Sequence, residues 1–219
     1  MLIADMQGLI NLMITLILTS SFILLGTRRL DSAVRIVIGQ ALLLTIFSLL
    51  LELMTGIREM FFAAFLTFTV KAVGIPYILK RVVSTVHGPR EAKSYVGFKA
   101  SFLAGGVLIV ISYLAAGQIM GHSSGLLSGA LPAAIAMMLI GLFVMMTRKL
   151  AVMQIVGLLL MENGLYLAGV GTTTGMPLVI ELGIFIDVLI GALIMAVLVF
   201  RINRTFSNIS TENLRNLKG

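Results

Sequence analysis

The sequence predicts an all-α integral membrane protein with about seven transmembrane helices. Hydrophobic residues make up 59% of its 219 residues and charged residues only 11%, a composition that soluble domains do not have. The apolar residues form seven runs of roughly 20 residues, the length that crosses a bilayer as a helix. Membrane β-barrels would instead show short strands with alternating polarity, so helices are the expected form.

The seven expected spans follow one another through mostly short connections, and the longest connection is Lys80–Lys99. Arg28 and Arg29 follow the first apolar run and no basic segment precedes it, which favours a retained span over a signal peptide. The spans are expected at Gln7–Gly26, Ala33–Met54, Met60–Leu79, Ala100–Met120, Leu126–Met146, Ala151–Gly171 and Leu178–Phe200.

The spans divide the chain into four expected regions. Residues 1–99 hold three helices and a cytoplasmic loop, and residues 100–125 hold a linking helix and an outer loop. Residues 126–200 form a three-helix unit, and residues 201–219 form a cytoplasmic tail.

The basic residues predict the orientation of these spans. All of the 16 Lys and Arg residues except Arg58 and Lys71 fall on one side of the predicted topology. Because cytoplasmic loops carry an excess of Lys and Arg, we expect the N-terminus outside and the C-terminus in the cytoplasm. The net charge of +7 is thereby explained by topology, so nucleic acid is not an expected partner.

The chain contains no cysteine and only two histidines. This composition excludes disulfides, thiolate metal sites and Fe–S ligation by this chain. We therefore expect neither a metal site nor a cofactor here.

Three ionisable residues, Lys71, Glu162 and Asp187, fall near the middle of three different spans. At 1.5 Å per residue each lies roughly 15 Å from the end of its span, about half of a 30 Å hydrocarbon core. Charges at that depth cost a few kcal/mol each and usually mark ion or proton pathways. The pattern predicts a proton or cation relay, and Pro76 is expected to loosen the helix that carries Lys71. A structural interpretation remains open, in which the charges pair only to hold helices together.

Four further residues are candidate members of the relay. Asn163 is adjacent to Glu162, and Tyr166 lies one turn further on the same helix face. Glu181 and Glu52 lie close to span ends, where they are either mouths of a proton path or simply solvated.

The C-terminal part resembles a known family, hydrogenase-4 component E, a membrane subunit of formate hydrogenlyase-type complexes. The resemblance rests on IVGLLLMENGLYLAG, LVIELGIFIDVLIGALIMAVLVFRI and the ending NLRNLKG. The last three spans are also similar to the 4L subunit of respiratory complex I and to the C subunit of multi-subunit Na⁺/H⁺ antiporters. When these subunits are aligned with the chain on Gly157 and on Ile190 and Gly191, their last-helix glutamate falls on Asp187. Their middle-helix glutamate falls on Leu159, one turn before Glu162.

The resemblance implies a non-redox subunit in a bacterial or archaeal cell membrane. It would contribute to translocation of protons or Na⁺, between membrane subunits that anchor the hydrogenase and large antiporter-like subunits. The [NiFe] and Fe–S centres would belong to partner chains, and the basic loops would face these partners or anionic lipid. Two alternatives remain: a subunit of a cation/proton antiporter, and a structural scaffold between larger membrane subunits.

Overall fold

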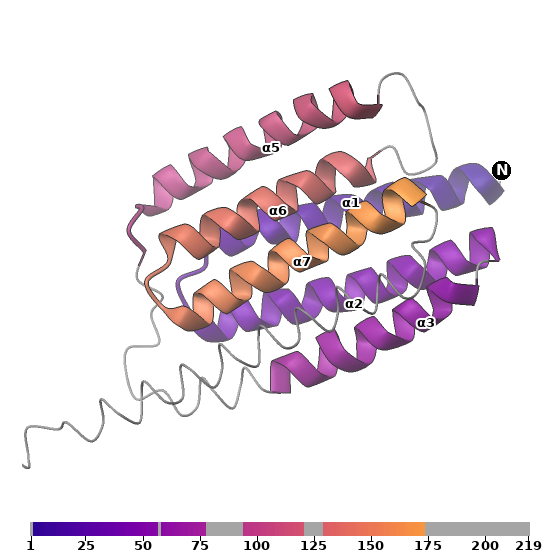
Figure 1. Cartoon of the computed structure of the whole chain (residues 1–219), viewed down its shortest axis with the longest axis horizontal. Coiled ribbons are helices and arrows are strands. Elements are labelled where there is room, and N and C mark those ends of the chain that lie inside the picture. The colour runs from indigo at the N-terminus through magenta and orange to yellow at the C-terminus, as the bar shows by residue number, and fades with distance from the viewer. Residues whose placement is uncertain (1, 57, 78–93, 121–128, 174–219) are drawn as a thin grey trace, which may run out of the picture.

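The computed structural model describes residues 2–56, 58–77, 94–120 and 129–173. Within these ranges the chain is a bundle of long helices lying roughly along one common direction (Figure 1). The helices are α1 Leu2–Gly26, α2 Leu30–Thr55, α3 Arg58–Leu66 with its π-helical continuation η1 Thr67–Gly74, α5 Phe98–Met120, α6 Ala130–Thr147 and α7 Ala151–Thr173.

Six candidate membrane spans lie in the described part of the chain, so the prediction of a multi-pass α-helical membrane protein is confirmed. Wherever the structure describes the expected end of a span, these six spans match the first six expected ones to within a few residues. Helix α5 begins at Phe98, two residues before the expected start of its span at Ala100. The expected seventh span, Leu178–Phe200, lies outside the described residues.

Helix α5 lies at one edge of the bundle and α3 at the other, with α1, α2, α6 and α7 between them (Figure 1). Helix α2 contacts α1, α3, η1 and α7. Its buried face carries apolar residues and also Gln40 and Ser48, which are fully buried. This arrangement brings a polar strip of α2 opposite both η1 and α7.

Helices α6 and α7 pack most closely because glycines let their backbones touch. A Cβ at Gly141 would lie 2.6 Å from the carbonyl oxygen of Gly157, and one at Gly164 would lie 2.8 Å from that of Ala134. Small residues are the usual means of close helix approach in membranes, where apolar side chains gain little by leaving lipid. The contact holds α7, and with it Glu162, in a defined rotation.

The helix that carries Lys71 is wider than an α-helix before Pro76. Residues Thr67–Gly74 are π-helical, and the N–H of Ile75 donates to the carbonyl of Val70, five residues earlier. A proline ring clashes with the carbonyl four residues before it, which gives a local reason for the wider turn. Thr67 and Lys71 both face the interior of the bundle as a result.

The substitution Gly141→Ala tests the α6–α7 contact. The added methyl group meets backbone atoms of α7, and overpacking of this kind costs typically about 1–3 kcal/mol. We expect the free energy of unfolding, measured by SDS titration of the protein in detergent micelles, to fall by that amount.

The matched control is Gly106→Ala on α5, where an added Cβ has no atom within 4 Å. Its stability should be unchanged or rise by up to about 1 kcal/mol, since alanine is the better helix former. Equal losses at Gly141 and Gly106 would contradict the close contact.

Candidate functional site: a buried ionic centre

The centre of the site is an ion pair between Lys71 of η1 and Glu162 of α7. Both side chains are buried, with 3% and 2% of the residue exposed. Sequence analysis singled out both residues, and the tertiary structure brings them together across 91 positions of sequence. Because a lone charge in such surroundings is expensive, each ion is the main compensation for the other.

A chain of four hydrogen bonds extends from the ion pair. The Lys71 ammonium donates to Asn163 Oδ1 at 3.3 Å, and the Asn163 amide donates to Gln40 Oε1 at 3.5 Å. The Gln40 amide in turn donates to the hydroxyl oxygens of Ser20 and Ser21, at 3.0 and 2.9 Å. Polar groups of α7, η1, α2 and α1 are therefore connected through the interior of the bundle.

A second branch runs through Tyr166, one turn after Glu162 on α7. The Lys71 ammonium lies 5.2 Å from the centre of the Tyr166 ring, within the range of a cation–π contact. The Tyr166 hydroxyl is hydrogen-bonded to Ser48 of α2. The Ser48 hydroxyl also lies within hydrogen-bond distance of the Leu44 carbonyl, so this branch ends on the backbone of α2.

Glu162 has one carboxylate oxygen in the ion pair and one outside it. Its Oε2 atom is buried and has no hydrogen-bond partner among the described residues. A buried acceptor without a partner is costly, so a hydrogen-bond donor from outside the described residues would be stabilised at this oxygen.

Of the remaining sequence-predicted residues, the structure describes Glu52 alone. Glu52 is in the last part of α2, is partly exposed, and takes no part in the contacts of the centre. Asp187 and Glu181 lie outside the described residues. In the described ranges no three His, Asp or Glu side chains gather as a metal site would require.

Sequence analysis missed Gln40, Ser20, Ser21 and Ser48. A glutamine in an apolar span is a signal that was available, because amides in membrane helices commonly bond to a neighbouring helix. The serines carried no such signal, since a serine in a helix can always bond to its own backbone, as these do.

The fold and the site define a class: a multi-pass α-helical membrane protein with a buried ion pair at the centre of a polar network. A protein-family model for NADH-ubiquinone/plastoquinone oxidoreductase chain 4L matches residues 130–219. These residues include α6 and α7, and so Glu162 and Asn163. No solved structure matches the chain.

Two relatives extend the similarity to more of the chain. The uncharacterized protein Rv0085 of Mycobacterium tuberculosis is 30% identical over 200 residues, which is 91% of each chain. Hydrogenase-4 component E of Escherichia coli K12 is 26% identical over 153 residues, covering 69% of this chain and 70% of its own. The chain belongs to the same family as Rv0085, and it is similar over about two thirds of its length to hydrogenase-4 component E.

A double-mutant cycle on Lys71 and Glu162 tests whether the ion pair is made in the folded protein. Removing one partner of a buried pair leaves an uncompensated charge and typically costs about 3–5 kcal/mol, whereas removing both costs much less. We expect Lys71→Met and Glu162→Gln to lower the free energy of unfolding in micelles. The double variant should lose less than the sum of the two, and additive losses would contradict the pairing.

Proposed function

We propose that this chain is a non-redox membrane subunit of a complex I-like module, of the kind found in hydrogenase complexes. We further propose that its buried ionic centre takes part in proton translocation. The similarity to chain 4L of NADH-ubiquinone oxidoreductase and to hydrogenase-4 component E supports the first part. The absence of cysteine in the sequence agrees with redox centres that lie in partner chains.

The observation that carries the second part is the Lys71–Glu162 pair with its hydrogen-bonded extension. The pair alone would suffice to hold two helices together. The extension through Asn163 and Gln40 to α1 adds groups that donate and accept hydrogen bonds in sequence, as a proton path needs. Ionisable residues in this position mark proton relays in many membrane proteins.

The chemistry of the centre follows from the coupling between its two charges. Two unit charges 4 Å apart interact by about 4 kcal/mol at an effective dielectric constant of 20. A proton that binds Glu162 cancels most of that attraction, and the Lys71 ammonium is then held mainly by Asn163 and the Tyr166 ring. A change of charge in an adjacent subunit would alter the relative stability of the ionised pair and the pair with a protonated Glu162. Redox events in partner chains would influence proton binding at this site in that way.

The π-helical segment gives Lys71 room to respond. π-Helical turns inside α-helices occur frequently at functional sites, and this one spans Thr67–Gly74. Its hydrogen-bond pattern can return to that of an α-helix by a shift of one residue, which would rotate Lys71 relative to Glu162. Asp187 and Glu181 of the expected last span are proposed as the continuation of the path.

The test is proton pumping by the intact complex in membrane vesicles, with Glu162→Gln in this subunit. The amide keeps the shape of the side chain and cannot accept a proton, so we expect coupled pumping to be lost while partner redox activity persists. The control is Asp31→Asn, an acid in the first turn of α2 with no proposed part in the relay, which should pump as the wild type does.

A loss of pumping through poor assembly must be distinguished from a loss of the relay. The amount of subunit in the purified complex gives the first readout, and the double variant Lys71→Met/Glu162→Gln gives the second. The double variant removes the uncompensated charge and should assemble well, yet it should still fail to pump. Wild-type pumping by assembled Glu162→Gln would instead support the scaffold interpretation.

The kind of complex is tested by affinity purification of the full-length chain from its native membrane. Large and small hydrogenase subunits among the copurified proteins are the expected result. Antiporter-type chains without hydrogenase subunits would support the alternative of a cation/proton antiporter.

A further inference from the structure

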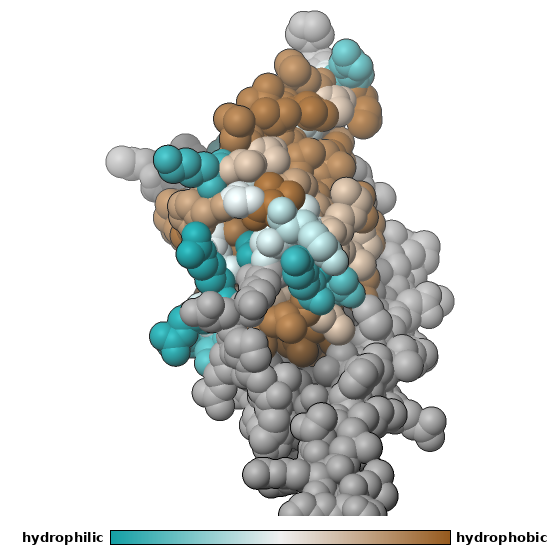
Figure 2. Space-filling model, turned by 90° about the vertical axis from the view of Figure 1, so that its left-hand side faces the viewer, coloured by the Kyte–Doolittle hydropathy of each residue, from teal (hydrophilic) through white to brown (hydrophobic). Residues whose placement is uncertain are grey.

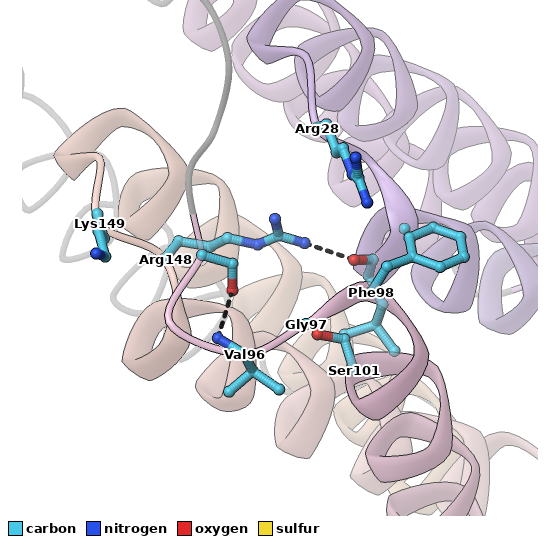
Figure 3. A pocket seen from close by; sticks show the side chains of 10 residues that line it. Arg28, Val96, Gly97, Phe98, Ser101, Arg148 and Lys149 are labelled. Atoms are coloured by element: carbon cyan, nitrogen blue, oxygen red, sulfur yellow. Dashed lines mark hydrogen bonds between the residues drawn. The ribbon is translucent and has the colours of Figure 1, made fainter.

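A cavity of about 330 Å³ lies at one end of the bundle, apart from the ionic centre. It is formed where the end of α1, the start of α5 and the connection from α6 to α7 meet (Figure 3). Hydrophilic residues gather on this end of the molecule, beside the apolar sides of the helices (Figure 2). The described residues of the centre take no part in its lining.

Positive charge dominates the lining of this cavity. Arg28, Arg148 and Lys149 are among the residues that form it, and no acid is among the described residues of the lining. Arg148 is only 5% exposed, and its guanidinium donates to the carbonyl of Leu25. Arg28 and Arg148 both line the cavity, so two like charges lie near each other there. Burial, and secondly the charge of Arg28, lowers the pKa of Arg148.

The other two cations lie at the rim and are held by aromatic rings. The Arg28 guanidinium is 5.6 Å from the centre of the Phe98 ring, and the Lys149 ammonium is 4.4 Å from that of Tyr95. These contacts orient the cations without neutralising them. A buried cation inside the cavity and two exposed cations at its mouth together form a site for an anion.

The start of α5 adds to the positive potential. Gly97 and Phe98 line the cavity, and the first turn of α5 contains no acidic residue. The first N–H groups of a helix have no acceptor within it and carry the positive end of the helix dipole, which favours anions.

The position of the cavity relative to the membrane points to one source of anion. Leu25 lies at the end of the span Met6–Gly26, and Phe98 begins the span Phe98–Ile119. The cavity therefore lies at the level where hydrocarbon gives way to headgroups, with apolar residues on one side and cations on the other. By the positive-inside rule this end faces the cytoplasm.

We propose that this cavity binds the phosphodiester headgroup of an anionic phospholipid of the cytoplasmic leaflet. The phosphate lies against Arg148 and Arg28, and the glycerol and the start of the acyl chains lie against Phe98. The volume is within the roughly 300–1,000 Å³ of ligand sites, and basic pockets between helices on this side of the membrane bind such headgroups. The proposal is independent of ion movement through the centre.

The experiment uses the full-length chain in a neutral detergent and measures lipid binding by native mass spectrometry. The probes are short-chain phosphatidylglycerol, short-chain phosphatidylcholine and inorganic phosphate. The test variant is Arg28→Gln/Lys149→Gln, which removes the two rim cations. The control is Arg29→Gln/Lys99→Gln, which removes the same charge from exposed neighbours that do not line the cavity.

We expect phosphatidylglycerol to bind more tightly than phosphatidylcholine or inorganic phosphate. Its Kd should rise roughly 5-fold for each rim cation removed and stay near the wild-type value in the control. Arg148→Gln should weaken binding further, and the rim variant keeps the test valid if that protein is unstable. Equal losses in test and control variants would overturn the site, and inorganic phosphate or phosphatidylcholine binding as tightly as phosphatidylglycerol would overturn the anionic lipid as its ligand.

Discussion

The cost of burying charge among apolar helices is the constraint on which the rest of this structure depends. Neither Lys71 nor Glu162 can be accommodated alone at this depth, so η1 and α7 must meet wherever the two residues fall along them. The remaining polar atoms then need partners of their own, and Asn163, Gln40 and the serines of α1 provide most of them. The network that we propose as a proton path is also the means by which four helices satisfy their buried polar groups.

The precision of the centre comes from a contact that contains no polar side chain. Glycines of α6 and α7 let the two backbones touch, and this close contact leaves α7 little freedom to rotate or slide. Helix α7 carries Glu162, Asn163 and Tyr166, so the position of three members of the network is determined from its other side. Lys71, by contrast, lies in a π-helical segment. The centre thus pairs a carboxylate on a closely packed α-helix with a lysine on a π-helical segment.

Charged side chains gather in two places, the ion pair in the middle of the bundle and the cavity at one of its ends. The two places differ in whether the described residues there supply charges of both signs. At mid-depth a cation is matched by an anion and the pair is closed off by packing. At the end of the bundle where α6 connects to α7, Arg28, Arg148 and Lys149 line a cavity, and no acid is among the described residues that line it with them. The first arrangement is the one for which we propose proton transfer between groups of the chain itself. The second favours an anion from outside the chain, and a lipid bound there would tie α1, α5 and the start of α7 to one place in the bilayer.

The sequence by itself determined the class of fold, six spans that the structure describes, and four residues of the centre, which are Lys71, Glu162, Asn163 and Tyr166. These features follow from local properties, because span length and hydropathy are set by consecutive residues and a charge within a span is conspicuous. The tertiary structure decided that Lys71 pairs with Glu162, that Gln40 joins them to α1, and that Glu52 stays apart. Helical periodicity gives the face on which a residue lies but not the helix that the face meets. In a bilayer nearly every helix face is apolar, so hydrophobicity does not determine which helices pack against each other. Helix pairing is determined instead by close backbone contacts and by the few buried polar groups that need partners.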